Sequence, residues 1–424
     1  MRAFPPPAAA LLVAAFLSVP AARAAAGATE PAPPPAPVAD FGATPLTFEA
    51  ACALAVADNL DYRAARLGRD LRAAEVRTAG LAPNPEFSFE TSDDTPHRTF
   101  SLDLPIEIGK RGSRVALARE TATLADVDDR AALLALRRRV RGGHYGLLAA
   151  TESARLARAA FDAAGRVREA AEARFETGAA PRIEVMQATL GVGRAQADVH
   201  LAEADRRAAL AEFNALFARP PEAPVTLAGD LGDAPALPSA ERAALLAGTA
   251  NADLRAAERA VAIEDRRLEM LKRDRYPTPV LSVGALYDAP DEFEDPGLRA
   301  AIAIGVPLFS RHQGEIDEAQ VRRTQASLRQ QALERAIEAR AGAAVGRAQA
   351  QAEQALAYRT TLLPTAEEIG ALAEESYRLG RATLLTLLEA QRSLRDVRHE
   401  AIAAQVSLQS ALADLEDVLG TPLE

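Results

Sequence analysis

Two stretches of the chain share one plan: residues 175–190 read FETGAAPRIEVMQATL, and residues 377–392, which lie 202 positions further on, read YRLGRATLLTLLEAQR. Each opens on an aromatic residue, reaches a glycine three positions later and then enters an apolar pattern of helical period. Glycine readily adopts the left-handed conformation that ends a helix. Each stretch therefore predicts a tight turn between two helices, at Gly178 and at Gly380.

The offset of 202 residues also relates other positions, which predicts an internal duplication. The pairs include Pro105/Pro307, Gly112/Gly314, Phe175/Tyr377, Ile183/Leu385, Ala188/Ala390, Phe217/Leu419 and Pro220/Pro422. Nearer the start of each half the offset is 194 for Pro83/Pro277 and 192 for Asn59/Asn251, so an insertion of eight residues is expected in the loop between the second pair of strands. Two equivalent repeats are expected at 46–220 and 239–424, joined by an equatorial linker at 221–238. Chance similarity in an alanine-rich chain is the alternative.

Each half is predicted to hold one medium helix, two short strands, one very long helix, the glycine turn and a final helix. The medium helices are expected at 46–81 and 240–276, and the strands at 86–92, 98–104, 280–286 and 299–306. The strands alternate apolar with polar or small side chains, as expected for a sheet with one apolar face. The apolar members are Phe87, Phe89, Phe100, Leu102, Leu281, Val283, Ile302 and Ile304.

The very long helices exceed what a compact domain can hold. A proline-free run from 106 to 176 predicts a helix of roughly 100 Å at 1.5 Å per residue. In the second half, Pro364 marks a kink or a break in the corresponding run.

The composition suits such a helical chain and excludes several classes of protein. Of the 424 residues 49% are hydrophobic but only 4% are aromatic, so the apolar content is mostly Ala, Leu and Val, which favours close helix packing. The single cysteine, Cys52, excludes a disulfide framework and a cysteine zinc site. The net charge of −10 argues against nucleic-acid binding. No convergent acid, base, nucleophile or metal set stands out, so we expect no enzyme activity, no cofactor and no resident metal.

The N-terminus has the pattern of an export signal. Residues 1–24 combine a basic start, a short apolar stretch and an Ala-x-Ala cleavage site, and residues 25–45 form a Pro/Ala-rich tether. No later apolar run is long enough for a membrane-spanning helix, so any membrane-spanning part must use the strands. Four short strands cannot close a transmembrane barrel, so several chains would have to contribute. A soluble sheet packed on helices is the alternative.

Several motifs resemble those of the TolC-type outer-membrane efflux proteins, over essentially all of residues 46–424. They are Ala82-Pro83-Asn84-Pro85-Glu86 before the first strand, Gly305-Val306-Pro307-Leu308-Phe309 after the last, Tyr377-Arg378-Leu379-Gly380 at the turn and Leu388-Glu389-Ala390-Gln391 after it. The stretch Glu107-Ile108-Gly109-Lys110-Arg111 is similar to the E-x-G-G-K-R signature of the cobalt–zinc–cadmium resistance branch, with one glycine missing.

The resemblance implies a mainly α fold with a small β part and a homotrimer. The twelve strands of such a trimer would form a β-barrel in contact with outer-membrane lipid, continued by an α-helical tunnel through the periplasm. A passive conduit of this kind receives its substrate from an inner-membrane RND-type pump through a periplasmic adaptor, or membrane fusion, protein. Divalent metal cations are the expected cargo. A multidrug conduit, a type I secretion conduit and a soluble periplasmic coiled-coil scaffold are the alternatives.

The resemblance also implies site residues. A periplasmic gate is expected just after the two turns, where side chains one helical turn apart would face the pore: Glu184, Gln187, Thr386 and Glu389. Adaptor-docking tips are expected at the turns themselves: Gly178, Ala179, Arg378, Leu379, Gly380 and Arg381. A ring of gate carboxylates would attract cations. The alternative for the gate carboxylates is that they are solvated charges on helix surfaces. The alternative for the tip residues is ordinary helix termination.

A group of basic residues is expected where the strands give way to the long helices. Its members are Lys110, Arg111, Arg114, Arg311 and His312. Contact with lipid phosphates and ordinary helix-surface charge both fit the sequence at this position.

Overall fold

The computed structural model describes residues 45–288 and 297–423. The expected signal peptide at 1–24, the expected tether up to residue 44 and the core of the expected loop insertion lie outside the described residues. The described chain forms two compact units. The sheet unit comprises residues 71–123 and 259–326, and the hairpin unit comprises residues 45–70, 124–258 and 327–423.

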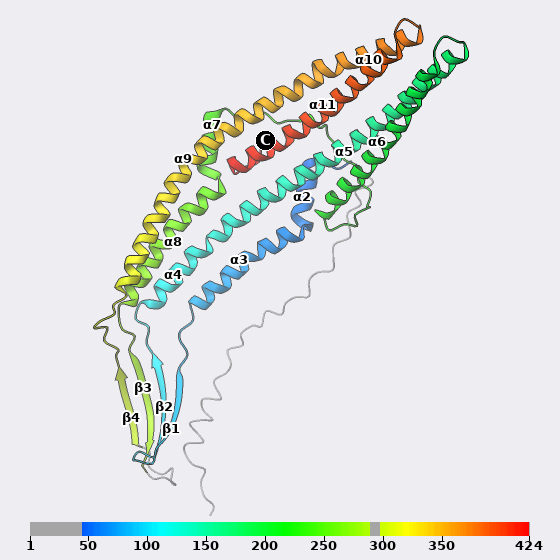
Figure 1. Ribbon diagram of the computed structural model, residues 1–424. Helices are drawn as coiled ribbons and strands as arrows, with labels where there is room; N and C mark the ends of the chain where they lie inside the picture. The colour runs from blue at the N-terminus through cyan, green and yellow to red at the C-terminus, as the bar shows by residue number, and fades with distance from the viewer. Residues whose placement is uncertain (1–44, 289–296, 424) are drawn as a thin grey trace, which may run out of the picture. The chain divides into compact units, whose positions relative to one another are not determined.

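The sheet unit contains one antiparallel sheet of four strands that follow their sequence order (Figure 1). The strands are β1 (Glu86–Thr91), β2 (Arg98–Pro105), β3 (Val280–Tyr287) and β4 (Gly297–Ala303). All four agree with the expected strands to within a residue or two except β4, which ends three residues before the predicted end at 306. Because β3 begins at Val280, its pairing with Ala303 is the last that β4 can make. Ile304 therefore follows the strand and does not lie in it.

The two medium helices were each predicted as one continuous helix, and this prediction is wrong. The first is divided into α2 (Phe48–Asp58) and α3 (Leu60–Ala79), and the second into α7 (Ala240–Ala250) and α8 (Ala252–Asp274). A buried asparagine stands at each break, Asn59 in the first half and Asn251 in the second. Its non-helical backbone, with ψ of 118° at Asn59 and 127° at Asn251, interrupts the helix, and its side chain compensates with hydrogen bonds.

The hydrogen bonds of the two asparagines are equivalent. Asn59 Nδ2 donates to the Leu216 carbonyl (2.9 Å), and its Oδ1 accepts the N–H of Tyr62 (2.9 Å). In the second half Asn251 Nδ2 donates to the Val418 carbonyl (2.9 Å), and its Oδ1 accepts the N–H of Leu254 (3.1 Å). The partners are related by the same sequence offsets as the repeat, so the duplicated sequence repeats its polar contacts as well as its helices.

The long helices start later and are less regular than predicted. The first begins at Lys110, not at residue 106, and is divided at Thr123 into α4 (Lys110–Ala122) and α5 (Leu124–Glu176), followed by α6 (Arg182–Ala215). Gly109, with φ of 74°, precedes its first turn, which explains the late start.

In the second half α9 (Gln313–Ala357) leads through a π-helical turn, Tyr358–Leu362, into α10 (Leu363–Arg378), and α11 (Leu384–Leu419) follows. The turn ends two residues before Pro364, where the sequence predicted a kink or a break. Proline has no N–H for the helical ladder, and a π-turn is one way of accommodating this loss.

The core of the hairpin unit is built largely from small residues, as the composition predicts. Ala51 and Ala55 of α2 pack against Leu136 and Val140 of α5, and all four side chains are almost completely buried. A second cluster joins α7, α9 and α11 through Ala243, Ala247, Ile337, Ala341, Ala348, Leu415 and Leu419. Alanine at the contacts lets the helix backbones approach closely.

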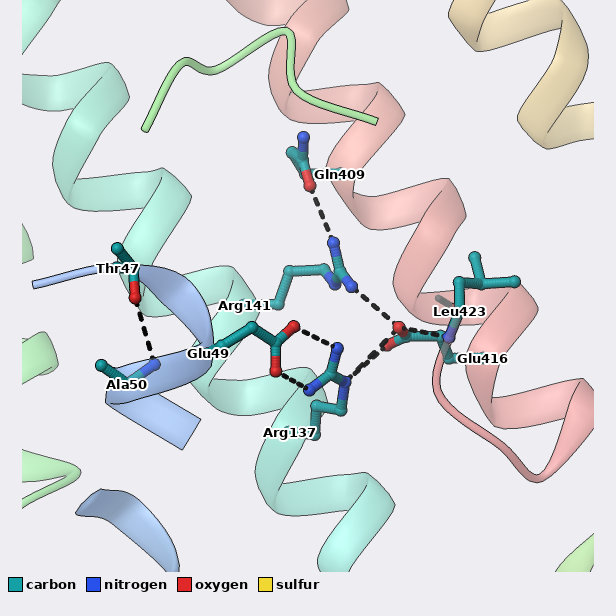
Figure 2. Close-up of polar contacts among 8 residues, drawn as sticks. All are labelled: Thr47, Glu49, Ala50, Arg137, Arg141, Gln409, Glu416 and Leu423. Atoms are coloured by element: carbon teal, nitrogen blue, oxygen red, sulfur yellow. Dashed lines mark hydrogen bonds and ion pairs between the residues drawn. The ribbon is translucent and has the colours of Figure 1, made fainter. Parts of the chain in front are cut away.

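A polar network lies between α2, α5 and α11 in the same unit (Figure 2). Arg141 Nη2 donates to Glu416 Oε1 at 2.8 Å, and the two side chains are only 4% and 3% exposed. Gln409 accepts a hydrogen bond from Arg141 (3.0 Å), and Glu416 also accepts the backbone N–H of Leu423 (3.0 Å). Arg137 binds Glu49 through two hydrogen bonds (2.8 and 2.9 Å) and approaches Glu416 at 3.4 Å.

Replacing Glu416 by Gln should destabilise the folded hairpin unit by about 3 kcal/mol, because Arg141 would remain buried without a carboxylate partner. The measurement is the free energy of unfolding from denaturant titration followed by helical circular dichroism. The matched control is Asp417→Asn, next in the chain, whose exposed carboxylate lies 3.7 Å from Arg138 and should contribute at most about 0.5 kcal/mol. Equal losses in the two variants would contradict this role for the buried pair.

Candidate functional site

The two predicted turns lie beside each other at one end of the hairpin unit (Figure 1). The first joins α5 to α6 and the second joins α10 to α11, and a shared apolar cluster packs them together. The cluster contains Val167, Ala171, Ala188, Ala373, Tyr377, Leu384 and Leu387. Residues that the chain separates by about 200 positions therefore meet at this end of the unit.

Both turns use the left-handed glycine that the sequence predicts. Gly178 has φ of 72° and Gly380 has φ of 73°. The N–H of Gly178 donates to the Phe175 carbonyl (3.0 Å), and the N–H of Gly380 donates to the Tyr377 carbonyl (2.9 Å). The following two N–H groups in each turn donate to one carbonyl of the preceding helix, that of Arg174 or of Ser376. The duplication therefore extends to the hydrogen bonds that close the helix ends.

One polar chain links the two hairpins at their tips. The Tyr377 hydroxyl donates to Glu184 Oε2 at 3.1 Å, and the tyrosine side chain is 1% exposed. Arg174 Nη1 donates to the Tyr377 carbonyl (2.8 Å), and its guanidinium carbon lies 4.8 Å from the centre of the tyrosine ring. Burial, followed by the bond to Glu184, raises the pKa of the Tyr377 phenol, which stays a hydrogen-bond donor at neutral pH.

The four predicted gate residues have different surroundings. Glu184 lies in the first turn of α6, is half-buried and is held by Tyr377. Gln187, one turn further on, is exposed and lines a groove of about 470 Å³ between α5, α6 and α11. Thr386 and Glu389 are exposed on α11, and Thr386 bonds to the helix-capping hydroxyl of Thr383 at 3.0 Å. Within the described chain, no hydrogen bond or ion pair joins Glu184 or Gln187 to Thr386 or Glu389.

The predicted tip residues are all exposed. Gly178 and Ala179 form the first tip. Arg378, Leu379, Gly380 and Arg381 form the second, where the Leu379 side chain is 54% exposed. Both tips therefore present surface that a partner could contact.

In the sheet unit, the predicted apolar strand residues share one face. Phe87 pairs with Leu102, which pairs with Val283, while Phe89 pairs with Phe100 and Leu281 pairs with Ile302. Cross-strand partners lie on the same side of a sheet, so these side chains form one continuous apolar surface. It is largely exposed: Phe87, for example, is 62% exposed and Ile302 is 69% exposed. The opposite face carries Glu86, Ser88, Glu90, Thr99, Ser101, Asp103, Ser282 and Arg299.

Two further observations concern the described residues. No group of three or more His, Cys, Asp or Glu side chains is arranged there to hold a metal ion. None of the described helices is both long enough and apolar enough to cross a membrane.

Paired helical hairpins and a sheet with an exposed apolar face are the features expected of a channel-type protein of the outer membrane. The sequence profile of the Outer membrane efflux protein family matches residues 52–219 and, a second time, residues 244–421. The chain belongs to this family, and the resemblance read from its motifs is confirmed. It is an outer-membrane efflux protein, and the two matches follow the two halves of the sequence.

Individual relatives agree with this family. The chain is 29% identical over 389 residues to the cobalt-zinc-cadmium resistance protein CzcC of Cupriavidus metallidurans, covering 89% of this chain and 91% of that protein. A solved structure of CusC superimposes with a TM-score of 0.74 at 17% identity, covering 88% of this chain and 92% of that one. The outer membrane protein VceC of Vibrio cholerae gives a TM-score of 0.71 at 18% identity, covering 89% and 97%. These structures confirm the mainly helical fold with its small sheet.

Sequence reasoning missed two of the three members of the polar chain at the tips. The sequence points to Tyr377 only as an aromatic residue at the end of a helix and as part of the turn motif, and it does not single out Arg174. A signal was available, because the two halves differ here: the offset of 202 residues places Arg174 opposite Ser376, Phe175 opposite Tyr377 and Glu184 opposite Thr386.

The left-handed backbone of the second tip predicts a stability effect at Gly380. Gly380→Ala should lower the free energy of unfolding by about 1 kcal/mol, because alanine resists positive φ. The control is Gly342→Ala in the interior of α9, where an added Cβ meets open space and alanine should stabilise the helix by up to about 1 kcal/mol. Denaturant titration of both purified variants checks the prediction, and a stabilising effect at Gly380 would contradict it.

Proposed function

We propose that the chain is the outer-membrane channel of a tripartite efflux system that exports divalent metal cations. The observation that carries the cargo assignment is the match to CzcC, a protein named for cobalt, zinc and cadmium resistance, over 91% of its length. An efflux conduit needs walls, an entrance and a gate, and no resident metal or nucleophile. The relatives of the chain are efflux proteins, and we propose no enzyme activity for it.

The proposed assembly is a homotrimer with a twelve-stranded barrel. In the order β1-β2-β3-β4 every neighbouring pair is antiparallel, so the edge strands β1 and β4 run in opposite directions. The β4 strand of one copy can therefore pair antiparallel with the β1 strand of the next, and a closed ring of three copies removes every free edge. The exposed apolar face would then contact outer-membrane lipid, while the polar face would line the pore.

The proposed gate lies at the hairpin tips. Glu184, Gln187, Thr386 and Glu389 occupy the first two turns of α6 and α11, directly after the two left-handed turns. The bond from Tyr377 to Glu184 ties the start of α6 to the end of α10. An opening motion that separates the two hairpins has to break this bond, so we assign it to the closed state. The carboxylates of three subunits would attract cations to the constriction.

The proposed contacts of the tips follow from their exposure. The periplasmic adaptor, which connects the channel to an inner-membrane RND-type pump, would contact Gly178, Ala179, Arg378, Leu379, Gly380 and Arg381.

The proposed division of the chain is a repeat at 46–220, a linker at 221–238 and a repeat at 239–424. The equivalent asparagine and glycine contacts of the two halves support it.

Deletion of the gene should lower the tolerated concentrations of zinc, cobalt and cadmium severalfold and leave tolerance to drugs unchanged. Growth is measured with each metal and with a panel of drugs, and a plasmid copy of the wild-type gene should restore metal tolerance. Sensitivity to drugs without sensitivity to metals would identify a multidrug conduit and overturn the proposed cargo. Recovery of the protein as a soluble monomer after osmotic shock would overturn the channel itself.

The proposed gate predicts that Tyr377→Phe favours the open state. Loss of one hydrogen bond to a carboxylate is worth about 1 kcal/mol or more, which corresponds to about a fivefold rise in open-state occupancy per subunit. Conductance of the purified channel in planar bilayers provides the measurement.

The matched control for the gate variant is Tyr358→Phe, which removes a bond of the same chemistry at an exposed position, from Tyr358 to Glu400 at 3.2 Å. It should leave conductance unchanged. The same conductance in wild type and both variants would contradict the gate.

A further inference from the structure

The four connections between helices and strands in the sheet unit all lie at one end of the sheet. They are residues 80–85 after α3, 106–109 before α4, 275–279 after α8 and 304–312 before α9. The strand register places Pro105 opposite Val280, and Val280 opposite Ala303. The N–H of Ile106 donates to the Pro279 carbonyl (2.8 Å), which joins two of the connections directly.

These connections expose an unusual density of large apolar side chains. The most exposed is Phe309, at 91%. The others are Leu81, Ile106, Ile108, Tyr276, Ile304, Val306 and Leu308. Large apolar residues on a surface mark a place where protein or lipid binds, particularly when they lie together. These eight side chains, here called the apolar collar, lie in the connections that join the strands of the exposed apolar face to the helices.

Basic residues stand directly beside the apolar collar. Residues 77–85, 106–111, 272–279 and 304–312 contain seven Lys and Arg but only two acidic residues, although the whole chain has a net charge of −10. The seven are Arg77, Lys110, Arg111, Lys272, Arg273, Arg275 and Arg311. None of them forms a salt bridge with any residue that the structure describes, and all except the half-buried Lys110 are exposed. Of the two acids, Glu107 is already paired with Arg114.

Arg114 holds two of these connections in place. Its Nε donates to the Ala79 carbonyl (2.9 Å), its Nη2 donates to the Leu81 carbonyl (2.8 Å), and its Nη1 binds Glu107 (2.6 Å). The guanidinium pairing also holds the pKa of the Glu107 carboxyl below its usual range. One side chain therefore fixes the end of α3 and the connection before α4, so that part of this surface is formed in advance of any ligand.

We propose that the apolar collar and its basic residues form a binding surface for the phosphate groups of anionic phospholipids in the periplasmic leaflet of the outer membrane. The proposal rests on the proposed function, since it needs the strands to lie in the bilayer. Lys and Arg beside exposed apolar side chains suit a membrane interface, because their aliphatic stems can lie along the acyl region while their charges reach the phosphates. An acidic soluble protein would satisfy the charges but would leave Phe309 and its apolar neighbours in water.

The test uses the full-length protein purified from outer membranes and reconstituted in phosphatidylcholine vesicles. Spin-labelled phosphatidylglycerol and phosphatidylcholine are added separately, and electron paramagnetic resonance measures how strongly each associates with the protein. The wild-type protein should prefer phosphatidylglycerol by about threefold or more at low salt, and the preference should fall at high salt. The variant Arg111→Gln/Arg273→Gln/Arg275→Gln should lose most of this preference.

The control variant Arg63→Gln/Arg335→Gln/Arg340→Gln removes the same number of charges from exposed helix positions of the hairpin unit and should keep the wild-type preference. Planar-bilayer conductance of all three proteins reports on the channel independently of lipid preference. A conducting protein that associates equally with both lipids overturns the lipid site alone. Absence of any motionally restricted lipid component and of any conductance overturns the proposed function together with it.

Discussion

The buried ion pair between Arg141 and Glu416 is the interaction on which the hairpin unit depends. It joins α5 of the first half of the chain to α11 of the second, inside a core made mainly of alanine and leucine. Burying two charges costs several kcal/mol unless each also finds hydrogen-bond partners. Gln409, Arg137 and the backbone of Leu423 are those partners, so a single carboxylate holds α5, α11 and the last residues of the chain together.

The duplication could be predicted from the sequence because the residues that interrupt helices recur at fixed distances. The left-handed glycines are the clearest case, since Gly178 and Gly380 end their helices through the same hydrogen bonds. The breaks at Asn59 and Asn251 could not be predicted from the same pattern. Asparagine within an alanine-rich amphipathic run is compatible with a continuous helix, and only the distant carbonyls of Leu216 and Val418 explain why the chain is interrupted there.

Three side-chain contacts between the two halves lie where their sequences differ. Three pairs related by the offset of 202 residues carry them: Asn214/Glu416, Arg174/Ser376 and Glu184/Thr386. In each pair one half supplies a charged side chain and the other a neutral one, and the charged member binds across to the other half. The resemblance to the efflux family implied Glu184 as a gate candidate. Its partner could not be found from local spacing, because Tyr377 is brought near only by packing between hairpins.

The sheet unit has an apolar face and edge strands that the described residues do not cover. Its four strands have an exposed apolar face, and within the described residues β1 and β4 each pair with a neighbouring strand on one side alone. In water, the apolar face would stay exposed and would not gain the stabilisation that hydrophobic burial provides. Unpaired edge strands in water also favour aggregation. Lipid can cover the face but cannot satisfy the backbone groups of an edge, whereas a second copy can satisfy the edges but leaves the face uncovered. A closed ring of copies in a bilayer would meet both requirements, so the proposed trimer would cover the apolar face and pair the edge strands in one assembly.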